Sequence, residues 1–227
     1  MLCFTKMLNS ILLTTHLSSL LSKLMKQLLD TTLSFFSIVI LSPLFIIVAI
    51  LIKLTMPGPV IFSQVRIGKH GKPFWIFKFR SMKVNESEDS ITLASDSRIT
   101  PFGKFLRTSK IDELPQLWNI LKGDMSFVGF RPDVPGYHDA LTGDDRKLLT
   151  IKPGLSGADS LAYPDEEKIL AQVEDPQKFY NEKLFPDKVR INREYVSSRS
   201  FLLDIRIILF TLLRRKLNDE KFKPRFV

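Results

Sequence analysis

An uncharged apolar run in the first quarter of the chain constrains the fold more than any other feature. No charged residue occurs between Asp30 and Lys53, and residues 31–52 are apolar apart from serines, threonines and one proline. A helix of this length would measure about 33 Å at about 1.5 Å per residue, close to the thickness of a bilayer's hydrocarbon core. A helix buried in a soluble protein is rarely apolar on every face. We therefore expect the run to insert into a membrane.

Ser42 and Pro43 interrupt the middle of this run. Proline removes one backbone hydrogen bond and crowds the carbonyl group four residues earlier, that of Val39, so we expect a kink near Ser42. Basic residues flank the run on both sides, whereas a straight spanning helix collects them on its cytoplasmic side. The flanks therefore favour a re-entrant helix that enters one leaflet, bends and returns to the same face. A kinked spanning helix is the alternative.

Three regions are expected along the 227 residues. Residues 1–24 form an N-terminal extension, either an amphipathic surface helix or a weakly ordered segment. Residues 25–56 hold the membrane-inserted helix, and residues 57–227 form one domain of ordinary size. Near the C-terminus, residues 201–213 are apolar but include two charged residues, which predicts an interfacial helix or a core helix.

The domain after residue 56 combines a hairpin with short helices. Two strand-like segments, Val60–Arg66 and Pro73–Arg80, flank a turn rich in glycine and lysine and predict a β-hairpin. Alternation along the second strand gives a mixed face carrying Lys78 and an apolar face carrying Trp75. The acidic segment Val84–Ser97 is expected to be an exposed, mobile loop.

Two short helices should follow this loop. Thr100 and Pro101 predict the start of a helix through about Thr108. Pro115 predicts a second helix that begins just before it and ends at Gly123. The expected fold class is therefore α+β: a helix-rich monotopic membrane protein with one re-entrant membrane helix, a short β-hairpin and interfacial amphipathic helices.

Composition limits the partners. The net charge of +9 and the pI near 9.6 favour anionic partners, whether nucleic acid, phosphorylated metabolites or an anionic membrane surface. Cys3 is the only cysteine, so the chain has no disulfide framework. Its three histidines are scattered along the sequence, which makes a zinc site unexpected.

Asp112 and Glu113 form the only adjacent acidic pair in a sharply basic stretch. Five cations surround them in the sequence: Lys104, Arg107, Lys110, Lys122 and Arg131. The helix predicted at Pro115 would place both carboxylates at its N-terminus, where the dipole keeps them ionised. A carboxylate can attack phosphorus and hold the group as an acyl phosphate. Mg²⁺ is usually held by one or two carboxylates together with substrate phosphates. The pair therefore predicts phosphoryl-transfer chemistry.

Five motifs together resemble the bacterial sugar transferases, the monotopic polyprenol-phosphate phosphoglycosyl transferases. Their order and spacing follow the family pattern from near Lys23 to about Lys216. The motifs are Leu41-Ser42-Pro43-Leu44-Phe45, Pro57-Gly58-Pro59-Val60-Ile61-Phe62, Phe77-Lys78-Phe79-Arg80-Ser81-Met82, the stretch from Ile111 to Ser126, and Ser200-Phe201-Leu202-Leu203-Asp204.

The resemblance implies a reaction and its partners. A nucleotide diphosphate sugar, generally a UDP-sugar, would give its sugar-1-phosphate to a polyprenyl phosphate such as undecaprenyl phosphate. This step would initiate the synthesis of a surface glycan, exopolysaccharide or lipopolysaccharide. The resemblance places the protein at the bacterial inner membrane, with residues 57–227 as the catalytic domain on the cytoplasmic face and no nucleic-acid partner. The oligomeric state and the sugar stay open.

The resemblance also implies roles for single residues. Asp112 would be the nucleophile that forms a phosphosugar-enzyme intermediate, and Glu113 would bind Mg²⁺. The substrate phosphates would meet a further set of residues: Arg107, Arg131 and Pro132, with Lys78 and Arg80 as additional clamps. Ser42 and Pro43 match the family's re-entrant bend.

The chain departs from the family pattern in two places. Phe130-Arg131-Pro132 stands where Pro-Arg-Pro is usual, so the loop entering Arg131 is expected to be less restricted. The segment Pro153–Asp159 lacks the Trp-Ala-Gln that commonly follows its glycines, and an acidic run at residues 165–167 comes soon after. These changes bear on the preference for sugar or nucleotide.

A non-catalytic alternative comes from charge alone. A membrane-anchored basic protein that binds anionic lipid or nucleic acid would show the same net charge. Its binding would depend on salt and would survive the loss of both acidic residues. We favour the enzyme because general basicity does not require the motif from Ile111 to Ser126.

Overall fold

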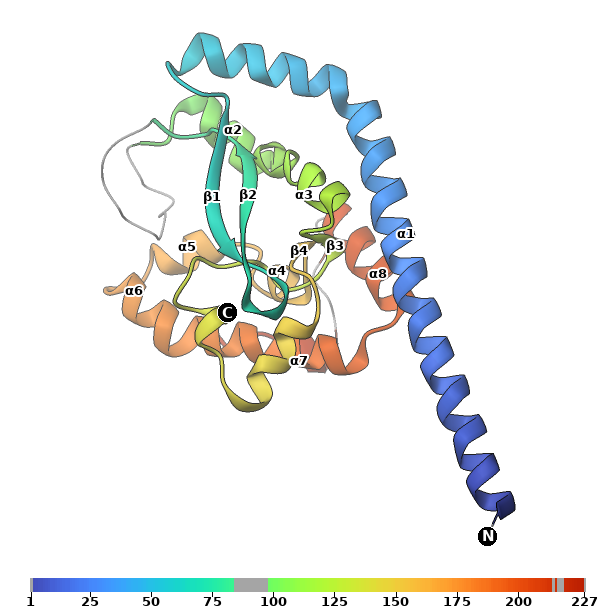
Figure 1. Ribbon diagram of the computed structural model, residues 1–227. Helices are drawn as coiled ribbons and strands as arrows, with labels where there is room; N and C mark the ends of the chain where they lie inside the picture. Colours follow the sequence, from blue (N-terminus) through green and yellow to red (C-terminus); the bar gives the residue numbers. More distant parts are fainter. Residues whose placement is uncertain (1, 84–97, 214, 216–218, 227) are drawn as a thin grey trace.

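A single long helix and an α+β body make up the molecule (Figure 1). The computed structural model describes residues 2–83, 98–213, 215 and 219–226, and of residues 2–20, 22 and 23 the backbone alone. The expected loop Val84–Ser97 lies outside the described residues. Helix α1 spans Leu2–Thr55 without interruption, so the expected boundary after residue 24 is not a break in secondary structure.

Helix α1 bends where the sequence predicts a kink. Pro43 lies inside the helix, and Figure 1 shows a long N-terminal leg joined to a shorter C-terminal leg that lies across the body. Because Pro43 has no N–H, the carbonyl oxygen of Val39 lacks its usual helical partner. The hydroxyl group of Ser42 donates to that oxygen at 2.8 Å. The bend is therefore confirmed, while a return to the same membrane face stays a prediction.

Most of the apolar surface of α1 between Leu24 and Thr55 is not covered by protein. The segment Leu24–Thr55 is long and apolar enough to cross a membrane, and only 11% of its most apolar stretch is buried. A core helix of a soluble protein would be mostly buried. Side chains such as Ile40 and Leu54 are 73% and 77% exposed. This long apolar helix is consistent with a monotopic membrane protein.

One side of the C-terminal leg of α1 packs against the body. Val48, Ile52 and Met56 are buried in a cluster with Phe79 and Leu106. Helix α3 makes the most extensive contact with α1, through a second cluster around Leu117 and Ile120.

Short elements build the rest of the body. They are strands β1 (Ile61–Ile67), β2 (Pro73–Phe79), β3 (Ser126–Val128) and β4 (Gly154–Ser156) and helices α2 (Pro101–Ser109), α3 (Gln116–Lys122), α4 (Ala158–Ala162), α5 (Glu166–Leu170), α6 (Pro176–Phe179), α7 (Phe185–Ser198) and α8 (Phe201–Leu212). The predicted helix at Thr100 is confirmed, with the Thr100 hydroxyl accepting from the Gly103 N–H at 3.0 Å. Gly123, with φ 88°, ends α3 as predicted.

The predicted hairpin is present, but its buried face differs from simple alternation. Strands β1 and β2 pair antiparallel, with Arg66 opposite Phe74 and Phe62 opposite Lys78. Both faces pack in part: Ile76 on the mixed face is buried against α3, and Phe79 on the apolar face is buried against α1, while Trp75 is 56% exposed. Lys78, on the mixed face, is partly buried, with 20% of its side chain exposed.

The main core lies in the second half of the chain and was not predicted. Helix α7 supplies Ile191 and Tyr195, both fully buried, to a cluster that also holds Phe130 and Leu148. Strands β3 and β4 form a short parallel pair beside it. A Cβ on Gly154 would lie 2.2 Å from the Gly129 nitrogen, so only glycine permits this close approach.

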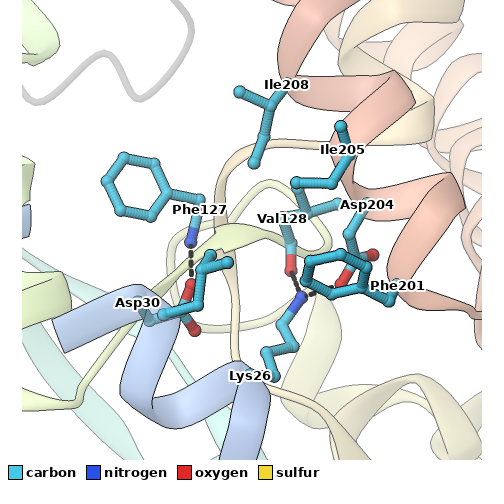
Figure 2. Close-up of a pocket in the computed structure, with 9 residues that line it drawn as sticks. Lys26, Asp30, Phe127, Val128, Phe201, Asp204, Ile205 and Ile208 are labelled. Atoms are coloured by element: carbon cyan, nitrogen blue, oxygen red, sulfur yellow. Dashed lines mark hydrogen bonds and ion pairs between the residues drawn. The ribbon is translucent and has the colours of Figure 1, made fainter. Parts of the chain in front are cut away.

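Three charged residues join α1 to α8 and β3, as Figure 2 shows. Lys26 donates to Asp204 and to the Val128 carbonyl oxygen, the latter at 3.3 Å. Asp30 accepts from the Phe127 N–H at 3.2 Å, and Asp204 also accepts from the Tyr195 hydroxyl. The cavity between them measures about 10 Å³, room for about one water molecule. We call this set of contacts the anchor joint.

Helix α8 combines both expectations for the C-terminal apolar run. Asp204 and Ile207 face the body and are buried. Leu202 and Leu212 are 78% and 74% exposed. One face of α8 is therefore a core face, and the other is apolar and uncovered, as an interfacial helix requires.

Candidate active site

The acidic pair lies in a tight turn between α2 and α3. Residues Ile111–Glu113 form one 3₁₀ turn, entered through Lys110 in the left-handed conformation with φ 61°. Helix α3 begins only at Gln116, after Pro115. The prediction that both carboxylates belong to the N-terminus of that helix was therefore wrong by one turn, because Pro115 is preceded by a separate 3₁₀ turn. Both side chains are buried, at 7% exposure.

Glu113 is held by two cations from other elements. Its Oε1 lies 2.8 Å from a guanidinium nitrogen of Arg131 and 3.4 Å from the Lys78 ammonium. Burial alone would raise the pKa of Glu113, but Arg131, Lys78 and Lys110 hold that pKa well below its usual range. Glu113 is therefore ionised at neutral pH.

Asp112 is in a different state from its neighbour. Burial and the negative charge of Glu113 raise the pKa of Asp112 to about 6. Its Oδ1 is buried without a hydrogen-bond partner among the described residues. The expectation that both carboxylates stay ionised remains a prediction, and Asp112 loses its charge at a higher pH than Glu113 does. The charged form of the Asp112 carboxylate is therefore destabilised, and one of its oxygens has no partner within the described part of the chain.

Lys78 and Arg131 are partly buried cations whose pKa values shift in opposite directions. Burial lowers the pKa of Lys78 to about 8, whereas the Glu113 carboxylate raises the pKa of Arg131 above its usual value. The main-chain N–H of Arg131 also donates to Asp159 Oδ2 at 3.3 Å.

The loop that enters Arg131 is held by the packing of Phe130. This side chain is fully buried, and its ring lies 4.7 Å from that of His138. Packing of Phe130 thus restrains the loop at the position where the family usually has a proline, whose ring would restrict φ.

The other predicted phosphate-binding residues occupy different settings. Arg107 contributes to the field at Asp112 and forms an ion pair with Glu167. Arg80 is buried, and its guanidinium donates to the carbonyl oxygens of Met56 and Pro57 at 2.6 and 2.7 Å. The structure thus gives Arg80 a scaffold contact at the end of α1, and its role as a clamp stays a prediction.

Sequence reasoning missed three residues close to this site. They are Arg66 on β1, Asp159 on α4 and Glu167 on α5. Arg66 shares a hairpin face with Lys78, as the register shows, and the β-strand alternation could have revealed it. Asp159 and Glu167 approach through long-range contacts that no local pattern announces.

The residues present fit a magnesium ion held jointly with a substrate. No group of three or more possible protein ligands occurs within the described part of the chain. Mg²⁺ does not need such a group, because one or two carboxylates with substrate phosphates and water suffice. Asp112 and Glu113 supply two adjacent carboxylates, and Asp112 Oδ1 has no protein partner there.

A buried carboxylate pair facing several cations, next to a largely uncovered apolar helix, is typical of a membrane-associated protein that handles phosphate groups. The model of the bacterial sugar transferase family matches residues 21–216. The chain therefore belongs to this family, as the motifs indicated.

Characterised and uncharacterised relatives agree with this assignment. The UDP-glucose:undecaprenyl-phosphate glucose-1-phosphate transferase of Escherichia coli K12 is 35% identical over 211 residues, covering 88% of this chain and 42% of that protein. The uncharacterized sugar transferase EpsL of Bacillus subtilis is 34% identical over 189 residues, covering 83% of this chain and 86% of EpsL.

A further relative acts on another sugar. The UDP-N-acetylgalactosamine-undecaprenyl-phosphate N-acetylgalactosaminephosphotransferase of Aeromonas hydrophila is 41% identical over 140 residues, covering 58% of this chain and 32% of that protein. The chain spans about two fifths of the length of the first curated relatives it matches.

Proposed function

We propose that the protein transfers sugar-1-phosphate from a nucleotide diphosphate sugar, a UDP-sugar, to a polyprenyl phosphate such as undecaprenyl phosphate. The observation that carries this proposal is the state of Asp112: a buried carboxylate with an unpartnered oxygen, set beside Glu113 and in the field of Lys78, Arg107 and Lys110. Its family and its relatives support the same reaction class. They also weigh against a merely basic, non-catalytic membrane protein.

The reaction proceeds in two displacements. An oxygen of Asp112 bonds to the sugar-bearing phosphorus of the donor, and the phosphoanhydride bond to the nucleoside monophosphate breaks, so that UMP leaves. A phosphate oxygen of the polyprenyl phosphate then attacks the same phosphorus. The bond to Asp112 breaks, the free carboxylate returns, and the product is a polyprenyl diphosphate sugar.

The cations solve the charge problem of this attack. A carboxylate approaching a phosphate is repelled by the phosphate oxygens, and fixed cations offset that repulsion without reorganising. Lys78 and Arg131 are held in place by Glu113, so the same carboxylate that would bind Mg²⁺ also positions two phosphate-facing groups. When bound, Mg²⁺ would neutralise charge on the phosphate oxygens. Arg107 and Pro132 complete the proposed phosphate-binding set.

The position of helix α1 supports access of a lipid acceptor to this site. Its C-terminal leg packs on Phe79, next to Lys78 in β2. The uncovered apolar surface of α1 and α8 would keep the site at the membrane surface, where a polyprenyl phosphate presents its head group. We place this face on the cytoplasmic side of the inner membrane, in a pathway that begins surface glycan or exopolysaccharide synthesis.

The test is a purified, detergent-solubilised chain incubated with UDP-sugars, Mg²⁺ and undecaprenyl phosphate. UMP release is expected with at least one UDP-sugar, and Asp112→Asn should lower it by about a thousandfold or more. Without acceptor, intact-mass measurement should show a sugar-phosphate adduct that Asp112→Asn lacks. Asp124→Asn is the matched control, because Asp124 lies in the same segment and pairs only with Lys122 among the described residues. Undiminished release by the Asp112 variant would refute the nucleophile, and no release with any UDP-sugar would refute the reaction.

A further inference from the structure

We propose that Arg66 is an additional phosphate-binding residue of this site, whose guanidinium contacts the diphosphate of the nucleotide donor. This inference rests on the proposed function. Arg66 lies on β1, on the hairpin face that also carries Lys78. The hairpin face whose Lys78 pairs with Glu113 therefore carries a second cation, Arg66, on strand β1.

The contacts of Arg66 differ from those of the ion-paired cations of the site. Its guanidinium donates to Gln64 Oε1 at 2.7 Å and to the Pro132 carbonyl oxygen at 3.4 Å, both uncharged acceptors. Its Nε is buried and has no hydrogen-bond partner in the described part of the chain. By contrast, Lys78, Arg131 and Arg107 each form an ion pair with a carboxylate. Arg80 also donates to uncharged oxygens and has an unpartnered Nε within the described part of the chain, but its acceptors lie at the end of α1.

No described carboxylate neutralises Arg66 directly. Asp133 exerts the strongest attractive influence on it, but Asp133 Oδ2 is taken by the Tyr180 hydroxyl at 3.0 Å and also lies 3.6 Å from His138 Nδ1. Burial lowers the pKa of Arg66, and the positive charge of Arg131 lowers it further. Taking a cation out of water without a counter-ion costs free energy that a bound anion would recover.

The position of Arg66 suits a diphosphate. Its charge acts on Lys78, Arg131 and Glu113, so it belongs to the same electrostatic cluster. Arg66 thus adds a third positive charge to those of Lys78 and Arg131, which already pair with Glu113. The added charge suits a diphosphate, because Glu113 partly offsets the charges of Lys78 and Arg131. The planar guanidinium offers parallel donors that match phosphate oxygens.

Binding measurements test the contact without requiring turnover. The full chain in detergent would be titrated with UDP and with inorganic pyrophosphate. Arg66→Gln should weaken both by at least about tenfold, because a charge-assisted contact is lost. Arg146→Gln is the matched control, since Arg146 is an exposed arginine that also donates to a main-chain oxygen. Unchanged affinity of Arg66→Gln for both probes would overturn the proposal.

A second pair of variants separates direct contact from positioning of the Pro132 loop. If Arg66 acted only through Arg131, Arg66→Gln in an Arg131→Gln background would cause no further loss. A further weakening of about tenfold is expected for a direct contact. Absence of any further weakening overturns the assignment.

Arg66→Lys covers the case in which the glutamine variant fails to fold. It keeps the charge but loses the fork, so pyrophosphate affinity should fall by about threefold. Affinity equal to that of the wild type would refute the guanidinium contact. The two proposals can be refuted separately. If no UDP-sugar gives UMP release, the pyrophosphate titration still tests the Arg66 contact. If Arg66→Gln does not change pyrophosphate affinity, UMP release by the wild type still tests the proposed reaction.

Discussion

The anchor joint and the acidic dyad, Asp112 and Glu113, both bury charge, but only the anchor joint has a partner for every charged group. At the anchor joint Lys26, Asp30 and Asp204 each have protein partners, including the Val128 carbonyl oxygen and the Tyr195 hydroxyl. At the dyad Asp112 Oδ1 is left without one among the described residues. Satisfied buried charges fix geometry, whereas an unsatisfied buried oxygen is available to a ligand. The same residue types therefore complete an attachment in one region and, in the proposed function, serve chemistry in the other.

The largest expected effect contrasts activity with stability at Asp112. Asp112→Asn should lower UMP release by about a thousandfold or more while raising the thermal midpoint in detergent. The sign follows from linkage: the pKa of Asp112 is raised in the folded state by burial and by Glu113, so its ionised form destabilises the fold above that pKa. A lower midpoint would show that Asp112 has a structural role like that of the joint.

The opposite result is expected at the anchor joint. Lys26→Met leaves the buried Asp204 without its counter-ion and should lower the free energy of unfolding by about 3 kcal/mol. The control is Lys53→Met, which removes an exposed lysine from the same helix. Thermal unfolding in detergent and UMP release per folded molecule would be compared. An unchanged midpoint for Lys26→Met would contradict the proposed division between the two regions.

A pH profile should report the dyad's own groups. In the proposed reaction Asp112 attacks as the carboxylate, and its pKa is about 6, so kcat/KM should fall by about tenfold for each pH unit well below that value. Lys78, with a pKa of about 8, loses its charge as the pH rises further, which should weaken donor binding. Glu113→Gln removes a negative neighbour and should move the acidic limb to lower pH. Movement to higher pH would refute the cause assigned to the shift.

The smallest expected effect concerns Arg107. Its partner Glu167 is partly exposed, at 45% for the side chain, and competes with any anion for the guanidinium. Glu167→Gln should therefore tighten pyrophosphate binding by about threefold. Asp165→Asn removes the same charge two residues away, where the carboxylate pairs with Lys168 instead. Equal tightening in both variants would point to general charge rather than to Arg107.

Local signals predicted the elements whose cause is local. The kink at Pro43, the cap at Thr100, the hairpin and the glycine stop at Gly123 all follow from the residues at those positions. The parallel β3–β4 pair and the core around α7 were not predicted, because both join segments far apart in the chain. Strand β2 shows the same limit: alternation assigns two faces, but packing against α1 and α3 decides which residues of each face are buried, so that Phe79 is buried while Trp75 is exposed.

By itself the sequence determined that the chain has a membrane-type helix with a bend and a carboxylate pair among cations. The length of the apolar run and the spacing of the charged residues are properties of the sequence and can be read without knowledge of the fold. Only the tertiary structure decided how those charges differ. It buries both carboxylates and pairs Glu113 with Lys78 and Arg131. Asp112 has a raised pKa and one oxygen without a partner among the described residues. The physical reason is that burial and ion pairing depend on which distant segments of the chain come into contact. The pKa of a side chain depends on its burial and on the charges around it.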